Sequence, residues 1–474
     1  MKIQQKCEWL FVFYIQEDQT LSIILNRLFQ TICEAGNKPA HSIWVIRQKI
    51  VAEDGIKGRF IPDVQTFDAD GNPSVLVSVP MELMGTRADD PDAWIAALRY
   101  ILTTVIHDRK AIFTWSHGCG FGVNVGDYET AKSLRNELIR FPDKIDRKGG
   151  IVETVHKNIL LNARQFDEIN HSSFRFLLDN ENMKPLPTDK KLQKNEFYFV
   201  EKGESFDCAK LELLWMSDFA KALEDLNLNK PFDLMIMINC YMQLFENGYM
   251  LRRVVDVLIG PETTMWAYGY DYRKIFGYVE ENPGIGTAEL AQKIVADYIA
   301  MHADMGHQQY LNETMLFANK LDKYELINAE LQQTTEEMCT RIDELKPVIN
   351  NLRGIPYFKT VSRRGGIFLL DLELWIKTLY EKQMLLDSDT DRLKAFLKLT
   401  KETRIAEHIG AEIISADNAG PGKFGYGGCS LFFPAGITLT AAGKFGWCEY
   451  LSGTRTSPFQ QDSSWDEFLK LLNG

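Results

Sequence analysis

Residues 231–249 read PFDLMIMINCYMQLFENGY, and the apolar run inside this stretch, Leu234 to Ile238, decides the fold prediction. A short run that is apolar at every position, without alternation, is typical of a strand covered on both faces, as in a parallel sheet. The run ends abruptly at Asn239-Cys240. Because open α/β sheets bind ligands in the crevice at the carboxyl ends of their strands, we expect Cys240 to lie at such a crevice.

A second apolar run, Ala111 to Trp115, ends in Ser116-His117-Gly118. One strand is therefore predicted to end in a histidine and another in a cysteine. A cysteine attacks a carbonyl as a thiolate, so it needs a neighbouring base, and His117 is the candidate base for Cys240. Gly118 has no Cβ, so its backbone N–H can approach a developing oxyanion. Only the fold can bring these residues together, and adjacent strand ends of a parallel sheet do so.

The same residues also have purely structural explanations. A cysteine after an apolar strand is more often a small core residue than a nucleophile, and strand ends frequently meet turn glycines. Cys119 is a competing nucleophile only if the strand continues through Gly118, which a glycine disfavours. A Gly-x-Ser-x-Gly elbow, which an unrelated α/β hydrolase would carry, does not occur in the sequence.

The order of expected elements predicts the class of fold. Apolar strand-like segments alternate with amphipathic helical ones, which is typical of a doubly wound, mostly parallel α/β sheet flanked by helices. Strands are expected at 9–16, 41–48, 58–67, 74–79, 111–115, 234–238, 254–259 and 427–434, and helices at 94–106, 207–226, 241–253, 287–301, 311–352 and 369–380. We predict a catalytic α/β domain over 1–305, with a flexible linker at about 143–204, and a helical and mixed region over 306–474 packed on it.

Composition restricts the partners and the compartment. The net charge of −12 argues against a nucleic acid or an anionic membrane as partner. No run is long enough to span a bilayer, and the apolar stretch Trp9 to Ile15 is predicted to be a core strand rather than a signal peptide. The 8 cysteines show no CxxC spacing, so structural zinc is not expected. We expect reduced thiols and a cytoplasmic protein, or a secreted one if a leader is missing from the sequence; the oligomeric state is open.

Two segments, TWSHGCGF and INCYMQLFE, resemble strand ends of the clostripain family of cysteine peptidases, relatives of caspases and gingipains. That family places a His-Gly at one strand end. At the next it places Asp-Ala-Cys-Leu-Met, with a glutamate six residues beyond the cysteine, and Glu246 has this spacing from Cys240. From the residues alone, Glu246 is expected on the polar face of its helix. The opening CEWLFVFYIQED, Glu82 to Gly85 and the late GGCSLFFP are also similar to family segments.

The resemblance implies a caspase-like fold and a cysteine endopeptidase that hydrolyses peptide bonds through a Cys240–His117 dyad. Gly118 would contribute to the oxyanion hole, and the partner would be a peptide or protein substrate. Some relatives need calcium, but no loop of regularly spaced carboxylates is visible, so no cofactor or metal is expected from the residues. Relatives also mature by self-cleavage after the histidine strand, where Lys144, Arg147 and Lys148 are candidate sites; an ordinary solvated turn is the alternative.

The sequence departs from the family pattern around the substrate pocket. Ile238 and Asn239 replace the Asp-Ala pair, and Tyr268 falls where the family has an acidic residue for arginine or lysine. Asp271 lies three residues later, and a buried guanidinium needs a carboxylate. The candidate pocket residues are therefore Asn239, Tyr268 and Asp271, with a modest preference for Arg or Lys before the scissile bond. The same departures favour an alternative, a catalytically impaired relative that binds peptides or protein partners.

Overall fold

The structure of the protein is a computed structural model. It describes residues 6–16, 28, 31–32, 34–51, 59–67, 73–78, 91–116, 122–124, 213–263, 265, 269–352, 369–385, 390–411, 427–433 and 457–473. His117, Gly118, Tyr268, Lys144, Arg147 and Lys148 lie outside these described residues.

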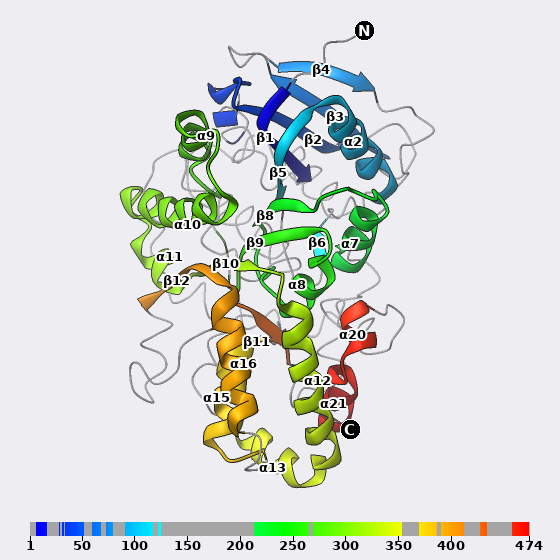
Figure 1. The fold of residues 1–474 in the computed structure, drawn as a ribbon, viewed down its shortest axis with the longest axis vertical. Coiled ribbons are helices and arrows are strands. Elements are labelled where there is room, and N and C mark those ends of the chain that lie inside the picture. Colours follow the sequence, from blue (N-terminus) through cyan, green and yellow to red (C-terminus); the bar gives the residue numbers. More distant parts are fainter. Residues whose placement is uncertain are drawn as a thin grey trace, which may run out of the picture.

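One large sheet organises the described chain (Figure 1). In spatial order its strands are β12 (Arg404–Ile409), β10 (Met315–Lys320), β9 (Val255–Pro261), β8 (Phe232–Ile238), β5 (Ile106–Trp115), β1 (Lys6–Gln16), β2 (His41–Val51), β3 (Arg59–Phe67) and β4 (Pro73–Ser78). The central strands β9, β8, β5, β1 and β2 are parallel, and antiparallel strands extend the sheet on both sides. The predicted mostly parallel α/β sheet is confirmed.

Helices cover both faces of this sheet. They are α2 (Pro91–Thr104), α7 (Met216–Glu224), α8 (Phe245–Leu251), α9 (Tyr272–Glu281), α10 (Thr287–Asp304) and α11 (Gln308–Glu313). Successive side chains of a strand point to opposite faces of the sheet, so two neighbouring residues of β1 show what covers each face. Tyr14 packs against Trp94 of α2 on one face, and Phe13 packs against Tyr272 and Phe276 of α9 on the other. Both faces of the strand are therefore buried beneath helices.

The C-terminal part of the chain adds a group of helices, which lies at the end of the molecule away from β4 (Figure 1). These are α12 (Tyr324–Thr340), α13 (Ile342–Leu352), α15 (Leu372–Glu381), α16 (Thr390–Thr403), α20 (Pro458–Asp462) and α21 (Trp465–Asn473). A short sheet joins them to the site: β11 (Leu369–Asp371) pairs antiparallel with β13 (Ser430–Phe432). A second short sheet pairs β6 (Gly122–Asn124) with β7 (Leu213–Trp215).

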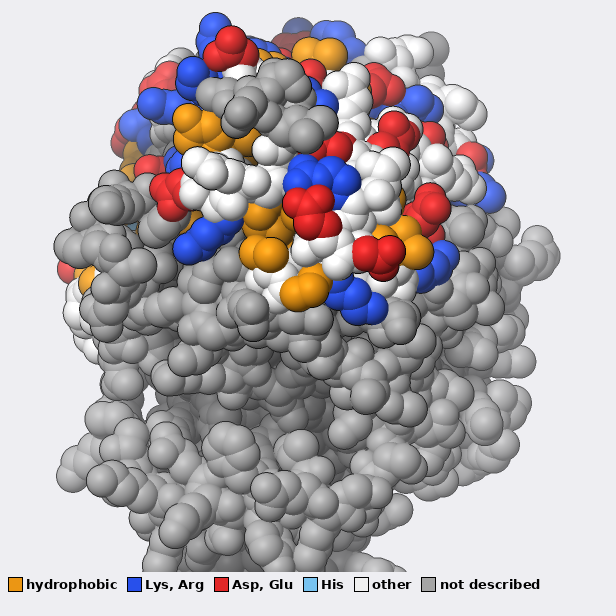
Figure 2. Space-filling view, turned by 90° about the horizontal axis from the view of Figure 1, so that it is seen from below, with side chains coloured by type: hydrophobic (Ala, Val, Ile, Leu, Met, Phe, Trp, Pro, Cys, Tyr) orange, Lys and Arg blue, Asp and Glu red, His pale blue; other side chains and the backbone are white. Residues whose placement is uncertain are grey.

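Viewed from the end that carries α13, acidic and basic side chains are interspersed over the described surface, with apolar groups between them (Figure 2). Exposed large apolar residues of these helices include Val348, Tyr380 and Leu471. Charges of both signs on this surface fit its solvent-facing position. In the described part of the chain, no helix is both long and apolar enough to cross a bilayer.

Several element boundaries differ from the sequence prediction. Ile106 begins β5 instead of ending the preceding helix. Of the predicted helix 207–226, the structure describes the part from residue 213 onward, and this part begins with a short strand, β7, followed by α7. The expected helical stretch 311–352 contains strand β10 before α12 begins. Short apolar runs fit either period, and pairing with β9 decides in favour of a strand here. No helix or strand was predicted where α16 and β12 lie.

The predicted boundary between 305 and 306 stays a prediction, as does the linker at 143–204, which lies outside the described residues. The large sheet runs across that boundary, because β10 and β12 come from the C-terminal side and continue the sheet beyond β9.

Candidate active site

Strand β5, which precedes His117, and strand β8, which precedes Cys240, are neighbours and end at the same edge of the sheet. Trp115 of β5 is in register with Ile238 of β8, and the two strands are parallel. Beyond them, Asn239 links the two chain segments: Thr114 Oγ1 donates to Asn239 Oδ1 at 2.6 Å, and Asn239 Nδ2 donates to Ser116 O at 3.0 Å. Ser116, the residue before His117, is therefore held beside the residue before Cys240.

Asn239 was predicted to border the substrate pocket. The structure shows that it is buried and that its amide bonds to β5 and the residue after it. An amide suits this position, because a single side chain here must both accept from the Thr114 hydroxyl and donate to the Ser116 carbonyl. Its role in a pocket stays a prediction.

Cys240 lies directly after β8, at the predicted edge, but its side chain is covered, with 2% of the residue exposed. Its Sγ accepts a hydrogen bond from Met265 N at 3.2 Å and lies 3.7 Å from Met265 O, to which the thiol can donate. A thiolate keeps the first contact and loses the second, because it has no proton to donate. The backbone of Met265 is therefore the immediate neighbour of the sulfur.

The chain that follows Cys240 is fixed on both sides. Tyr241 N donates to Thr263 O at 2.9 Å, and Gln243 N donates to Pro261 O at 3.0 Å. On the opposite side, Ser430 N donates to Gln243 O at 2.9 Å. Tyr241 has a φ of 60°, a conformation that costs free energy for a residue with a Cβ and that is found preferentially at functional sites. The cysteine thus precedes a strained residue held between two backbone segments.

Glu246, six residues after Cys240, does not lie on a polar helix face, so that expectation is wrong. The residue is fully buried in α8, and its Oε1 accepts from Phe432 N at 3.0 Å. Removal from water raises the pKa of this carboxyl from 4.5 to about 7, and the hydrogen bond from Phe432 partly opposes this increase. Glu246 therefore ties α8 to β13 beside the chain that follows the cysteine.

A second set of buried acids supports β13 from the other side. Asp371 accepts from Leu374 N at 2.8 Å and from Gly427 N at 2.7 Å, which caps α15 and fixes the start of the β13 segment. Glu262 accepts from Ser430 Oγ at 2.9 Å. Burial raises the pKa of Asp371 to about 6, and burial together with the nearby Asp371 charge raises the pKa of Glu262. Both carboxyls hold the β13 segment in place against Gln243.

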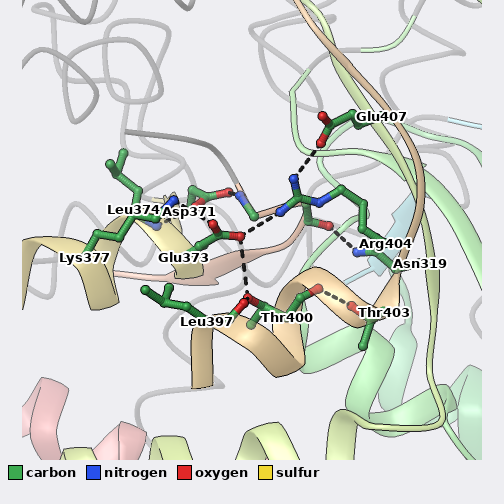
Figure 3. Close-up of polar contacts among 12 residues, drawn as sticks. Asn319, Asp371, Glu373, Leu374, Lys377, Leu397, Thr400, Thr403, Arg404 and Glu407 are labelled. Carbon is green, nitrogen blue, oxygen red and sulfur yellow. Dashed lines mark hydrogen bonds and ion pairs between the residues drawn. The ribbon is translucent and has the colours of Figure 1, made fainter. Parts of the chain in front are cut away.

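A charged group from β12 completes this network, and Figure 3 shows Asp371, Glu373 and Arg404 facing one another. Arg404 Nη2 donates to Glu373 Oε2 at 2.7 Å, and Arg404 Nη1 donates to Glu407 Oε2 at 2.6 Å. Asn319 Nδ2 of β10 donates to Gly428 O at 2.5 Å. The last strands of the large sheet are therefore joined to β11, α15 and β13.

Glu246→Gln should change the pH dependence of stability. A carboxyl with a raised folded pKa contributes stability that is complete below pH 4.5 and is lost as the pH rises to about 7. Glutamine can still accept from Phe432 N and carries no charge. We expect the variant to match the natural chain at pH 4 and to exceed its free energy of unfolding at pH 8 by about 3 kcal/mol. Urea unfolding at both pH values measures this.

Glu344→Gln is the matched control, with the opposite expected effect on stability. Its carboxyl is exposed, and Arg341 lowers its pKa, whereas burial raises the pKa of Glu246. The contribution of Glu344 to stability is present above the unfolded pKa and disappears in acid, so its loss should lower stability at pH 8 and not at pH 3. A Glu246→Gln variant that is less stable than the natural chain at pH 8 would contradict the assignment.

Asp271, the predicted pocket acid, begins α9. It is the N-cap residue: Oδ1 accepts from Lys274 N at 3.2 Å, and Oδ2 lies 4.0 Å from Lys274 Nζ. Its side chain remains 23% exposed. The carboxylate thus has a structural role at the end of the segment that covers Cys240, and its role in substrate recognition stays a prediction.

The described residues contain no group of three or more His, Cys, Asp or Glu side chains placed to hold a metal ion. The calcium expectation is not tested by this finding. Sequence patterns did not point to Met265, Glu262, Asp371 or Arg404, because the roles of these residues depend on backbone contacts and on pairings between distant segments. The late segment GGCSLFFP was identified through its resemblance to the clostripain family. Asp371 binds its first residue, Gly427, and Glu262 binds Ser430 of strand β13.

Comparison with known proteins identifies the family. The model of the clostripain family, Peptidase_C11, matches residues 189–471, more than half of the chain; this range includes Cys240 but not His117. Among solved structures, an inactive zymogen C11 protease from Parabacteroides distasonis is similar at a TM-score of 0.52 and 14% identity, covering 96% of this chain and 98% of that one. A secreted C11 cysteine protease from Bacteroides thetaiotaomicron gives a TM-score of 0.48 and 10% identity, covering 98% and 99%.

No match was found among curated proteins. The first of the two solved structures shows that the fold is that of a C11 protease. The match of the family model over more than half of the sequence, with Cys240 inside it, shows that the chain belongs to the clostripain family of cysteine peptidases.

Proposed function

We propose that the chain is an endopeptidase in which Cys240 is the nucleophile and His117 is its base. The observation that carries the proposal is the register of β5 and β8, which ends both strands at one edge, with Asn239 bonding to Ser116 O. His117 directly follows Ser116, and Cys240 directly follows Asn239. Family membership supports the same reaction class.

In the proposed reaction, the imidazole of His117 takes the proton of the Cys240 thiol, and the thiolate attacks the carbonyl carbon of the scissile bond. The N–H of Gly118 donates to the oxygen that becomes negative. The C–N bond then breaks, and the leaving amine takes the proton from His117, which leaves a thioester on Cys240. Water, deprotonated by His117, attacks the thioester and releases the acid and the free thiol.

Access to the sulfur requires a change near Met265. With 2% of Cys240 exposed and Met265 N and O in contact with Sγ, a substrate carbonyl reaches the sulfur only after the groups that cover it have shifted. The described structure therefore represents a covered state of the nucleophile, and catalysis requires an open one.

For the residue before the scissile bond we propose a modest preference for Arg or Lys. Asp271 is the acid on this segment that can supply a carboxylate, since it keeps partial exposure while it caps α9. A preference of about tenfold for Arg over Leu would correspond to about 1.4 kcal/mol, close to the contribution of one hydrogen bond to a charged group.

Cleavage-site profiling with a broad peptide library tests this preference. We expect Arg and Lys to be enriched before the cleaved bond, and Asp271→Asn to reduce the Arg-to-Leu ratio to near one. Asp391→Asn is the control, because it removes an equal charge from an exposed ion pair on α16. Enrichment of apolar residues that Asp271→Asn leaves unchanged would contradict the preference while leaving the peptidase assignment intact.

The second candidate function is peptide or protein binding without hydrolysis. The covered Cys240 and the Ile238-Asn239 pair favour it. It requires that labelled library peptides bind at the same edge without being cut, whereas the first candidate requires cleavage products. In both cases the partner is a peptide or protein. The exclusion of nucleic acid and membranes, and the cytoplasmic location, stay predictions.

A further inference from the structure

Three buried carboxyls from three different elements hold one short segment of the chain, residues 427–433, which contains β13 and is the β13 segment. The carboxyls belong to Glu246 of α8, Glu262 after β9 and Asp371 of β11. Each accepts a hydrogen bond from a different residue of the segment: Asp371 from Gly427 N, Glu262 from Ser430 Oγ and Glu246 from Phe432 N. The segment is therefore attached through acceptors that can each take up or lose a proton.

The charges of the three carboxyls converge on Cys429, which lies within the segment and is itself buried. Burial raises the pKa of the Cys429 thiol, and the charges of all three carboxyls raise it further. Tyr324 of α12 lies beside the same group, and burial raises the pKa of its phenol, so it stays neutral. The three carboxyls are thus close enough to one position of the segment for their charges to act on it together.

The cations near these carboxyls are already bound to other acids. Arg404 donates to Glu373 at 2.7 Å and to Glu407 at 2.6 Å, and Lys377 donates to Glu373 at 2.6 Å (Figure 3). The charge of Arg404 opposes the increase in the pKa of two of the three carboxyls without cancelling it. In the described part of the chain, none of the three forms an ion pair of its own. Their negative charges would therefore be poorly compensated.

This arrangement makes the attachment of the segment depend on pH. Burial disfavours the charged form of a carboxyl, so the closed segment binds these protons more tightly than an open, solvated one does. A raised pKa in the closed state stabilises that state at low pH, and the advantage is lost as the pH rises through about 6 for Asp371 and about 7 for Glu246. Carboxylates that ionise side by side also repel one another.

The same segment supports the chain that follows Cys240. Ser430 N donates to Gln243 O at 2.9 Å, and Ser430 forms a parallel bridge with Leu244. Gln243 stands three residues after Cys240, and its N–H is bound on the other side by Pro261 O at 3.0 Å. The β13 segment is therefore one of two supports of this stretch of backbone.

We propose that the β13 segment is a proton-dependent latch on the chain that follows Cys240. With the three carboxyls neutral, the segment stays bound to α8 and to Gln243. With the carboxyls ionised, it separates from both more often, and the stretch after Cys240 loses one of its supports. The latch goes beyond the proposed function and holds for either candidate function, because it depends only on contacts within the folded chain.

Cys429 reports the opening of the latch, because a buried thiol of raised pKa reacts only after the segment has left its place. The full chain is treated with N-ethylmaleimide at pH 5 and at pH 8, and the rate at Cys429 is followed by peptide mass spectrometry. Division by the rate for the urea-unfolded chain at the same pH removes the effect of thiol ionisation and gives the open fraction. Cys7, a free and buried cysteine of β1, is the internal reference for global unfolding.

Two variants remove a charge and keep an acceptor: Glu262→Gln and Glu246→Gln, whose amide oxygens can still accept a hydrogen bond. If one of them does not accumulate as folded protein, the other carries the test. Asp297→Asn is the matched control. Asp297 is also buried, but it lies on α10 and pairs with Lys274 at 3.1 Å.

We expect the open fraction at Cys429 to rise at least about tenfold from pH 5 to pH 8 while that at Cys7 stays constant, since one unit of pKa difference corresponds to a tenfold change in population. Each Gln variant should keep the value at pH 5 and lower the value at pH 8 at least about fivefold, and Asp297→Asn should change neither. An equal open fraction at both pH values, a parallel rise at Cys7, or Gln variants that match the natural chain at pH 8 would overturn the proposal. No cleavage is measured, so the result is separate from the test of Cys240 as nucleophile.

Discussion

Cys240→Ala should lose peptide hydrolysis by at least about 10⁴-fold in kcat, because no thioester can form without the sulfur. The variant removes one small side chain whose Sγ contacts the backbone of Met265, and alanine has no polar group that would need a partner there, so folding should persist. Initial rates on a library-derived peptide, with circular dichroism to check the fold, measure the effect.

Cys7→Ala is the matched control for this variant. Cys7 is another free, buried cysteine, it lies on β1, and burial raises the pKa of its thiol to about 12, so it holds no thiolate near neutral pH. We expect Cys7→Ala to retain full activity. Equal activity of the Cys240→Ala variant and the natural chain would instead remove Cys240 from the reaction and favour a different nucleophile.

His117→Ala should reduce kcat/KM by about 10²-fold to 10⁴-fold, since general-base assistance to the attacking group contributes this much. The loss should be smaller than that of Cys240→Ala, because a fraction of the thiol ionises without help, and it should shrink as the pH is raised toward 9. A pH series of kcat/KM for both chains measures this.

His107→Ala is the control for the base. It lies on the same strand, β5, at the opposite end from Ser116, and its Nδ1 contacts Val105 O at 2.9 Å. Its activity should stay within about twofold of the natural chain, as expected for a residue remote from the reaction. Retention of full activity by His117→Ala at pH 7 would exclude His117 as the base and leave the Cys240 assignment standing.

The parts of the fold that were predictable from sequence are those with one dominant signal. The unbroken apolar run at Leu234 to Ile238 requires cover on both faces, and the structure places β8 in the centre of the sheet between β5 and β9. The equivalent run at Ala111 to Trp115 predicted the neighbouring strand, and the shared edge followed from parallel pairing. These conclusions depend on burial, which a sequence records directly as hydropathy.

The missed elements are those that only tertiary contacts decide. Met315 to Ala318 is apolar enough for a helix or a strand, and its pairing with β9 makes it β10. A helical period cannot be followed through 311–352, because strand β10 interrupts the expected helix.

In the candidate site, too, some features could be predicted from the sequence and others depend on tertiary contacts. Cys240 and Asn239 were placed at the strand edge correctly because their position depends only on where β8 ends. The cover over the sulfur depends on Met265 backbone atoms, which carry no side-chain signal in a sequence. Glu246 was misplaced because a glutamate in a helix is normally exposed, whereas here Phe432 N from a distant segment binds it.

The most direct test of the Cys240 assignment is covalent labelling with a peptidyl acyloxymethyl ketone, followed by intact-mass and peptide-level mass spectrometry. We expect one label per chain, attached to Cys240, with labelling reduced at least about 100-fold in His117→Ala. Absence of a label on Cys240 under conditions where the chain cleaves peptides, or an equal label on another cysteine, would contradict it.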